Sequence, residues 1–548
     1  MGIERNHRFL FWPNARFHDD IIAIVLTNPT TAAPYPRSGF SPMQHDVTWC
    51  NRKSKKTALG CRRCRVAFPP RTNRRIQCVT EENRALTGGL RGRRRPGACP
   101  TETFATLIRF HPMDTNEILL ASQDYLFPAV FHYYREPLVI ARAKNQFVYD
   151  SAGRAYLDFF GGILTISVGH CNDRVNRAIH AQLDTLQHVS TVFVTEPQAA
   201  LAKKIASLTP GGRLTKSFFT NSGTEANETA ILAARCYTGS TEIIALRHSY
   251  HGRSAMAMAL TGQAAWRLGG AVQPGIVHAH NAYCYRCPFG LAYPSCDIRC
   301  ARDMQDLIRT STLGRVAGFI AEPIQGVGGF ITPPKEYFAI VADIVRQSGG
   351  IFISDEVQTA WGRTGSKWFG IERYGVTPDV ITSAKGLGNG CPIGVTVATP
   401  EVAAGVTGLT ISTFGGNPVA TTAAKAVLDL IEEENLLANA AETGAYLRGK
   451  LEELRDKHAI VGDVRGMGLM QALELVEDRQ TKAPAARATA ELMEAARRTG
   501  LLIGKGGTYG NCIRISPPMN IAKSDVDDFA RLLDNSLEEC VNFNGTRS

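Results

Sequence analysis

Four short apolar runs, separated by long stretches with helical spacing, constrain the fold of this chain more than any other feature of its sequence. The runs are Ile243–Leu246, Gly318–Ala321, Ile351–Ser354 and Val380–Thr382. Apolar segments of this length between helical stretches are typical of buried strands in a parallel sheet covered by helices. The alternation therefore predicts an α/β domain with a largely parallel sheet.

Segments on either side of these runs extend the expected architecture. Phe147–Asp150 and Ala155–Phe159 have the composition of two strands joined by a turn, and Arg174–Val189 has helical spacing. Later in the chain, Leu428–Lys457 is a long amphipathic stretch and Gly468–Leu475 has a strand-like composition. These features predict a second, smaller α+β domain at the C-terminus.

The first 110 residues differ from the rest in charge and pattern. They hold 20 Lys and Arg against 7 Asp and Glu, whereas the rest of the chain holds 41 against 43, so the net charge of +11 originates there. Because the segment has no sustained period, we expect a disordered basic extension; a processed leader and an over-long gene start stay open. A nucleic-acid-binding regulator that acts through this extension is the alternative function from another class, although the segment lacks a helix-turn-helix pattern and an aromatic platform.

Three motifs at expected strand ends bear on the chemistry. The first is Ser222-Gly223-Thr224, which follows a strand-like segment and precedes good helix formers. Gly223 lets backbone amides approach a ligand closely, and a helix start carries partial positive charge. The motif therefore suits a phosphate monoester, although a capped helix without a ligand has the same pattern.

The second motif is Asp355, directly after the apolar run Ile351–Ser354. Open parallel sheets bind ligands at this edge. A buried carboxylate there needs a cation, and a protonated pyridine nitrogen would serve, since the carboxylate would keep it protonated. The alternative is an aspartate that caps a loop.

The third motif is Lys385, which follows the run Val380–Thr382 and precedes Gly386. Desolvation would lower the pKa of this lysine and free its amine to attack an aldehyde; an exposed loop lysine is the alternative. Taken together, a phosphate cradle, a carboxylate for a ring nitrogen and a lysine for an aldehyde match the functional groups of pyridoxal phosphate.

From about residue 114 to 540 the chain resembles the class III aminotransferases of the fold-type I pyridoxal-phosphate superfamily. Six motifs carry the resemblance: Ser222-Gly-Thr-Glu-Ala-Asn-Glu, Ser249-Tyr-His-Gly-Arg, Ala321-Glu-Pro-Ile-Gln-Gly, Asp355-Glu-Val-Gln, Ala384-Lys-Gly and Ser412-Thr-Phe-Gly-Gly-Asn-Pro. The segment 284–300 is similar to one in the alanine–glyoxylate branch. We therefore expect residues 1–110 to be the extension, 111–175 a segment joining the small domain, 176–425 the large pyridoxal-phosphate-binding domain and 426–548 the small domain.

The resemblance also implies a role for each residue of the site. Ser222, Gly223 and Thr224 would bind the phosphate, Tyr250 and Val357 would lie on opposite faces of the ring, and Gln358 would reach the ring hydroxyl. His251 would orient Tyr250 or another neighbour, Asp355 would pair with the ring nitrogen, and Glu322 would lie near the substrate and the ring oxygen. Lys385 would hold the cofactor as a Schiff base. Thr413 would contact the phosphate bound by the partner subunit, which implies a homodimer with shared sites.

Two further groups have defined expectations. Arg514 alternates with apolar residues in Cys512–Ile515, and a bidentate arginine is the preferred clamp for a carboxylate; the resemblance makes it the anchor of the substrate α-carboxylate. Cys284, Cys287, Cys296 and Cys300 could form a tetrathiolate zinc site, but transamination needs no metal and none is predicted. Cys61 and Cys64 have the spacing of a zinc-ligand pair, but Cys78 and Cys99 do not, so no zinc site is expected there.

The predicted function is a pyridoxal-phosphate-dependent transamination by a ping-pong mechanism. An α- or ω-amino acid would donate its amino group, and an oxo acid such as pyruvate, glyoxylate or 2-oxoglutarate would accept it. Lys385 would move a proton between the substrate carbon and the cofactor. A decarboxylase, racemase or aminomutase of the same fold is the alternative. Since no stretch has the roughly 20 apolar residues of a membrane helix, the expected location is the cytoplasm, or an organelle if residues 1–110 are a leader.

Overall fold

The computed structural model describes residues 45–49, 62–66, 113–270 and 273–545. The chain forms two compact units, Met1–Arg109 and Phe110–Ser548. In the first unit, β1 (His45–Trp49) and β2 (Arg62–Val66) form an antiparallel pair that the sequence analysis did not predict. Cys64 lies in β2, and the rest of the predicted basic extension lies outside the described residues.

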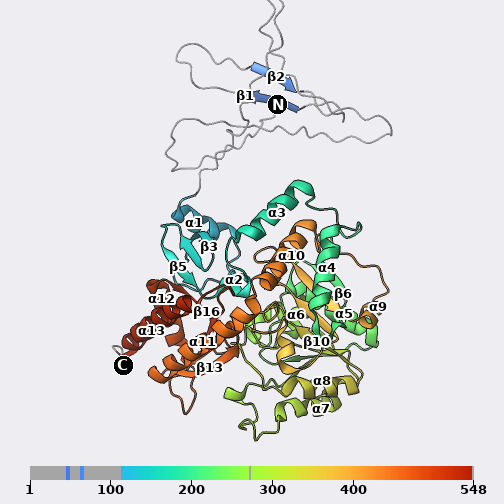
Figure 1. Ribbon diagram of the computed structural model, residues 1–548, viewed down its shortest axis with the longest axis vertical. Coiled ribbons are helices and arrows are strands. Elements are labelled where there is room, and N and C mark those ends of the chain that lie inside the picture. Colours follow the sequence, from blue (N-terminus) through green and yellow to red (C-terminus); the bar gives the residue numbers. More distant parts are fainter. Residues whose placement is uncertain (1–44, 50–61, 67–112, 271–272, 546–548) are drawn as a thin grey trace, which may run out of the picture. The chain divides into compact units, whose positions relative to one another are not determined.

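A seven-stranded sheet organises the second unit (Figure 1). Its order is β6 (Lys216–Thr220), β12 (Gly394–Ala398), β11 (Val380–Ser383), β10 (Ile351–Asp355), β9 (Gly318–Ala321), β7 (Ile243–Leu246) and β8 (Ile276–Ala279). All neighbouring pairs are parallel except those of β12, which runs antiparallel to β11 and β6. The expected α/β domain with a mainly parallel sheet is confirmed, and each of the four apolar runs forms a strand.

Helices pack against both the sheet and one another. They are α3 (Asp173–Thr185), α4 (Glu196–Leu208), α5 (Gly223–Thr238), α6 (Ala255–Leu260), α7 (Arg299–Ser311), α8 (Tyr337–Gln347), α9 (Pro400–Ala404) and α10 (Pro418–Glu433). Helix α5 contacts five strands of the sheet, because its alanines and Ile231 form a buried face of small residues. Ser222 caps its start, and Gly239 ends it in the left-handed conformation at φ 68°.

Two four-stranded sheets form the smaller α+β part of this unit. One has the order β13 (Val461–Met467), β14 (Met470–Leu475), β17 (Cys512–Ile515) and β16 (Gly504–Gly506); the other has β15 (Leu501–Leu502), β5 (Ala155–Asp158), β4 (Phe147–Asp150) and β3 (Ile140–Lys144). The accompanying helices are α1 (Thr115–Tyr125), α2 (Gly161–Leu164), α11 (Leu436–Lys457), α12 (Ala486–Thr499) and α13 (Lys523–Gly545). Because β15 pairs with β5, the N-terminal segment shares a sheet with the C-terminal part. The domain limits at 175 and 425 stay predictions.

The amphipathic stretch Leu428–Lys457 is helical, but it does not form one continuous helix. The stretch belongs to two helices, α10 and α11, which are separated by Glu434 and Asn435. Asn435 adopts the left-handed conformation at φ 51°, which asparagine tolerates better than most residues and which interrupts a right-handed helix. The amphipathic pattern continues through this break, so periodicity alone did not reveal it.

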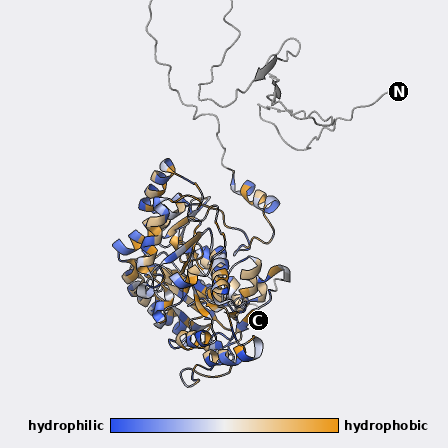
Figure 2. Ribbon diagram, turned by 90° about the vertical axis from the view of Figure 1, so that its right-hand side faces the viewer, coloured by the Kyte–Doolittle hydropathy of each residue, from blue (hydrophilic) through white to orange (hydrophobic). Residues whose placement is uncertain are grey.

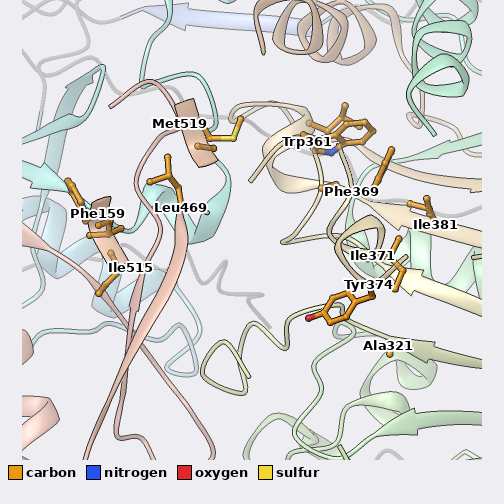
Figure 3. Packing of buried hydrophobic residues seen from close by; sticks show 14 of the residues in the cluster. Phe159, Ala321, Trp361, Phe369, Ile371, Tyr374, Ile381, Leu469, Ile515 and Met519 are labelled. Atoms are coloured by element: carbon orange, nitrogen blue, oxygen red, sulfur yellow. The ribbon is translucent and has the colours of Figure 1, made fainter. Parts of the chain in front are cut away.

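One large cluster of buried hydrophobic residues joins the smaller sheets to the seven-stranded sheet. Figure 3 shows Phe159, Leu469, Ile515 and Met519 at one side of the cluster and Trp361, Phe369 and Ile381 at the other. Hydrophilic residues follow the outer helices, whereas hydrophobic residues gather on the inner elements (Figure 2). No helix in the described part of the chain is long and apolar enough to cross a membrane.

Candidate active site

Five loops at one edge of the seven-stranded sheet surround a cavity of about 340 Å³. They follow β6, β7, β9, β10 and β11, the edge where parallel strands present their carboxyl ends to a ligand. Ten residues predicted from the sequence line this cavity: Ser222, Gly223, Thr224, Tyr250, His251, Glu322, Asp355, Val357, Gln358 and Lys385. The structure therefore brings together residues that are up to 163 positions apart in the chain.

The loop at the start of α5 is shaped by two glycines. A Cβ atom on Gly223 would lie 2.8 Å from Val357 Cγ2, and one on Gly252 would overlap the Thr224 side chain. Gly252 also has φ 135°, a conformation that other residues rarely adopt. Ser222 Oγ accepts from the Glu225 amide at 3.3 Å. The helix start thus faces the cavity as a narrow, glycine-lined pocket suited to an anion.

Asp355 is buried at the end of β10 and is held by three donors. Asn227 Nδ2 and His251 Nδ1 both donate to Asp355 Oδ2, over 2.8 Å and 2.7 Å, and the Val357 amide donates to Oδ1 over 3.1 Å. These three hydrogen bonds fix the position of the carboxylate at the end of the strand. His251 therefore contacts Asp355, while the Tyr250 amide donates to Glu322. His251 Nε2 is buried without a partner among the described residues.

Glu322 follows β9 and is almost completely buried. Its Oε1 accepts from the Tyr250 amide at 3.0 Å and its Oε2 from the Gly326 amide at 2.8 Å. Burial raises the pKa of Glu322 to about 7, an effect that the two amides and His251 oppose. Through its hydrogen bond with the Tyr250 amide, Glu322 fixes the loop that carries Tyr250 at the cavity wall.

Lys385 follows β11 with φ 38°, which is unusual for a residue with a side chain. It lies between Ala384 and Gly386, and a Cβ atom on Gly386 would contact Ser167 Oγ closely, at 2.5 Å. Burial and the positive charge of Arg514 together lower the pKa of Lys385 to about 8, although the nearby carboxylates of Glu322 and Asp355 oppose the shift. A neutral amine is therefore accessible near physiological pH.

A second cavity of about 400 Å³ adjoins the first and shares Tyr250 and Lys385 with it. Most of its other walls are apolar or aromatic, formed by Phe131, Tyr133, Ile163, Trp266 and Val327. Arg514 on β17 also lines it. This strand lies inside its sheet, between β14 and β16, so Arg514 is not on a sheet edge.

Arg514 is a buried cation without a carboxylate partner in the part of the chain that the structure describes. It is 4% exposed, and its buried Nε and Nη1 atoms have no hydrogen bonds to described residues. Within that part of the chain, only Nη2 has a hydrogen-bond partner, Tyr133 Oη at 3.0 Å. An unpaired buried guanidinium is costly, so the site is complementary to an anionic group.

The first cavity fits pyridoxal phosphate. The glycine-lined start of α5 would hold the phosphate, and Asp355 would hold the protonated ring nitrogen. Gln358 Oε1, which is buried without a partner among the described residues, is free to bind a polar ring substituent. Lys385 supplies a buried amine for the aldehyde. Each functional group of the cofactor therefore has a matching side chain or helix end at the cavity wall.

Comparison with known proteins agrees with this geometry. The class-III aminotransferase family pattern matches residues 131–537. The chain belongs to this family. An Arabidopsis thaliana protein named alanine–glyoxylate aminotransferase 2 homolog 2, mitochondrial, is 45% identical over 423 residues, covering 77% of this chain and 87% of the relative. A leucine/methionine racemase from Thermococcus litoralis is 36% identical, covering 77% and 96% respectively.

A solved structure gives the same result for the fold. The amine transaminase from an uncultivated Pseudomonas species, in its PLP-bound form, aligns with a TM-score of 0.71 and 32% identity. It covers 74% of this chain and 95% of its own. The present aminotransferase is thus a transaminase of the fold-type I class that uses pyridoxal phosphate.

Thr413 is the one predicted site residue that lies outside both cavities. It is exposed in the loop between α9 and α10. This loop packs beside residues 188–194: Thr191 Oγ1 donates to the Ser412 carbonyl at 3.3 Å, and the His188 and Phe414 rings are 5.1 Å apart. Thr413 therefore reaches no group of its own active site in this aminotransferase.

The four cysteines of the 284–300 segment line a small separate cavity. All four are free thiols. Burial raises the pKa of Cys284 to about 11 and that of Cys300 to about 12. Within the described residues, no group of three or more His, Cys, Asp or Glu side chains is arranged to hold a metal ion.

Asn227 and Tyr133 contact site residues but were not predicted. Asn227 lies one turn after Gly223 on α5, and residues four apart share a helix face. That spacing from the phosphate motif could have indicated that Asn227 points into the site. Tyr133 lies 381 positions from Arg514, and no local pattern links the two.

Proposed function

We propose that this aminotransferase moves the amino group of an amino acid to a small oxo acid, with alanine and glyoxylate as the first pair to test. The Arg514 guanidinium lies in a cavity that Lys385 also lines and has no carboxylate partner among the described residues, and this observation carries the proposal. A carboxylate bound there would place the rest of the substrate beside Lys385. The name of the Arabidopsis relative supports the choice of alanine and glyoxylate.

When bound, pyridoxal phosphate supplies an electron sink for the bond broken at the substrate carbon. Asp355, positioned by its three hydrogen bonds, would pair with the proton on the ring nitrogen. Lys385 Nζ would bind the cofactor and then carry the proton that leaves the substrate carbon, since its lowered pKa makes the neutral amine available. Tyr250 and Val357 would orient the ring between them, and Arg514 would orient the substrate.

A donor panel tests the proposal in the first half-reaction. Purified enzyme loaded with pyridoxal phosphate is mixed with single α-amino acids, ω-amino acids and simple amines, and conversion to pyridoxamine phosphate is followed by absorbance. We expect alanine to be among the fastest donors and glyoxylate to restore the starting spectrum. Lack of conversion by every amino acid would contradict the proposal. Lys385→Ala should lose both the conversion and the long-wavelength absorbance of the bound cofactor.

Racemisation is a second candidate, because the Thermococcus litoralis relative is named a leucine/methionine racemase. The apolar walls of the second cavity could accept such side chains. A racemase would convert an L-amino acid to the D form without an oxo acid. Chiral chromatography of each donor after incubation without acceptor separates the two functions.

We infer that the active form is a homodimer in which Thr413 contacts the cofactor phosphate bound by the partner. Val192, Phe193, Val194, Leu409, Ile411 and Phe414 are exposed and belong to two adjacent segments, which we call the 188–194/409–414 surface. A pocket beside Phe414 includes Asn221, Cys391 and Pro392, which also line the cofactor cavity. The surface is thus continuous with the site, as shared sites require.

We propose an organelle as the location to test first, although the sequence favoured the cytoplasm. The basic surplus of residues 1–110 and the word mitochondrial in the name of the Arabidopsis relative support this choice. Fluorescent fusions of the full chain and of residues 111–548 should differ in location if the first segment is a leader.

A further inference from the structure

The Arg514 guanidinium is held by a tyrosine from near the start of the second unit. Arg514 Nη2 donates to Tyr133 Oη over 3.0 Å, and the same hydroxyl donates to the backbone carbonyl of Lys505 over 3.3 Å. Lys505 lies on β16, the strand beside Arg514. The phenol therefore bridges the arginine and the neighbouring strand.

Aromatic contacts fix the ring that carries this hydroxyl. The Tyr133 ring packs edge-to-face against Phe131 at 5.2 Å and against Phe160 at 5.5 Å between centroids. The Arg514 guanidinium lies 5.1 Å from the Phe160 ring and 5.8 Å from the Phe330 ring. The hydroxyl and the guanidinium thus share one aromatic surround.

Gly506 confines the arginine from the strand side. A Cβ atom on Gly506 would lie 3.0 Å from Arg514 Cδ and 3.1 Å from its Nε. The arginine stem therefore occupies the space where a side chain of residue 506 would be. With its stem against Gly506 and its Nη2 atom on Tyr133, the guanidinium keeps its Nε and Nη1 atoms buried and without hydrogen-bond partners among the described residues.

We propose that Tyr133 is a positioning residue that makes a carboxylate a required feature of the substrate. This inference rests on the proposed role of Arg514 as the carboxylate anchor. Because Tyr133 holds the cation in place, a simple amine that lacks a carboxylate would leave a buried charge unpaired, whereas an amino acid would pair it. The site would therefore select amino acids over simple amines.

The test compares Tyr133→Phe with Tyr134→Phe in the cofactor-loaded enzyme. Tyr133→Phe keeps the ring and removes the hydroxyl that bridges Arg514 and Lys505. Tyr134→Phe is the matched control because it removes a neighbouring hydroxyl whose ring lies beside a different arginine, Arg497, at 5.4 Å. The inhibition constant of propionate, and that of the uncharged propionamide, is measured against the best amino acid donor. We expect Tyr133→Phe to raise the inhibition constant of propionate by about tenfold, as for loss of a hydrogen bond to a charged group. The same variant should raise the KM of the amino acid donor more than it lowers kcat.

Gly506→Ala gives a second, independent perturbation of the same guanidinium. This variant should also raise the inhibition constant of propionate more than that of propionamide. It therefore tests the inference even if Tyr133→Phe does not fold. Propionate constants within twofold of the wild type in the folded variants would overturn the inference. If Arg514→Gln also leaves propionate binding unchanged, the proposed anchor itself fails; if only Arg514→Gln changes it, the anchor stands and the role of Tyr133 fails.

Discussion

Lys385 and Glu322 are buried ionisable residues whose pKa values approach one another. Burial disfavours the charged form of each, so the pKa of Lys385 falls to about 8 and that of Glu322 rises to about 7. Both groups can therefore change charge near neutral pH, which is a property of residues that transfer protons.

The pH dependence of cofactor loading should reveal the pKa of Lys385. Only the neutral amine attacks an aldehyde, so the loading rate of the apoenzyme should rise with pH and level off above pH about 8. An ordinary lysine would continue to gain rate up to pH about 10.4. Arg514→Gln removes a positive neighbour, so its midpoint should move to higher pH. Stopped-flow absorbance measures both, and a wild-type midpoint near 10 would contradict the assignment.

Asn227 should be as important for cofactor binding as its hydrogen bonds suggest. It donates to Asp355 and to the His251 carbonyl, and it accepts from Thr382 Oγ1 at 2.6 Å. Asn227→Leu removes these bonds, so we expect the cofactor dissociation constant to rise about tenfold or more. Fluorescence titration measures it, with the exposed Asn176→Leu as the control. Equal affinities in the two variants would show that Asp355 does not depend on Asn227.

At the level of elements, the two ends of α5 have different tasks. Gly223→Ala would bring a Cβ atom to 2.8 Å from Val357, whereas a Cβ atom on Gly239 would meet nothing within 4 Å. We expect Gly223→Ala to weaken cofactor binding. Gly239→Ala should leave it unchanged and lower stability by about 1 kcal/mol, because φ is 68° there. Cofactor titration and thermal denaturation of both variants distinguish these effects. A loss of cofactor affinity in Gly239→Ala but not in Gly223→Ala would refute the assignment of the phosphate site to the start of α5.

The sequence predicted where strands lie in the chain better than it predicted which strands pair in the sheet and in which direction. Runs such as Ile351–Ser354 are mostly apolar because both faces of the sheet are covered, so their composition identifies them as strands. The antiparallel direction of β12 depends on tertiary pairing with β6 and β11, which no local pattern records. The same limit applies to the site: Lys385 and Asp355 follow recognisable strands, whereas Tyr133 meets Arg514 only through the folded chain.

At the scale of the whole second unit, the site depends on three parts of the chain. Tyr133 comes from the N-terminal segment, Lys385 from the seven-stranded sheet and Arg514 from the antiparallel sheet. The pairing of β15 with β5 connects the first and last of these parts. The second cavity is therefore complete only when the N-terminal segment and the strands β16 and β17 are in place beside the large sheet.

The proposed shared active site requires a homodimer, and substitutions on the 188–194/409–414 surface can test whether this surface forms the dimer interface. Leu409 and Val194 are almost fully exposed there, and an exposed apolar patch of this kind marks an interaction surface. Leu409→Lys with Ile411→Lys would place two charges in the interface, so we expect the double variant to sediment as a monomer. Its affinity for the cofactor should also fall, because the contact with the partner's Thr413 would be lost. Leu313→Lys, on an exposed leucine in another loop, is the matched control. A double variant that remains dimeric, or a wild-type enzyme that is monomeric at full activity, would exclude shared sites through this surface.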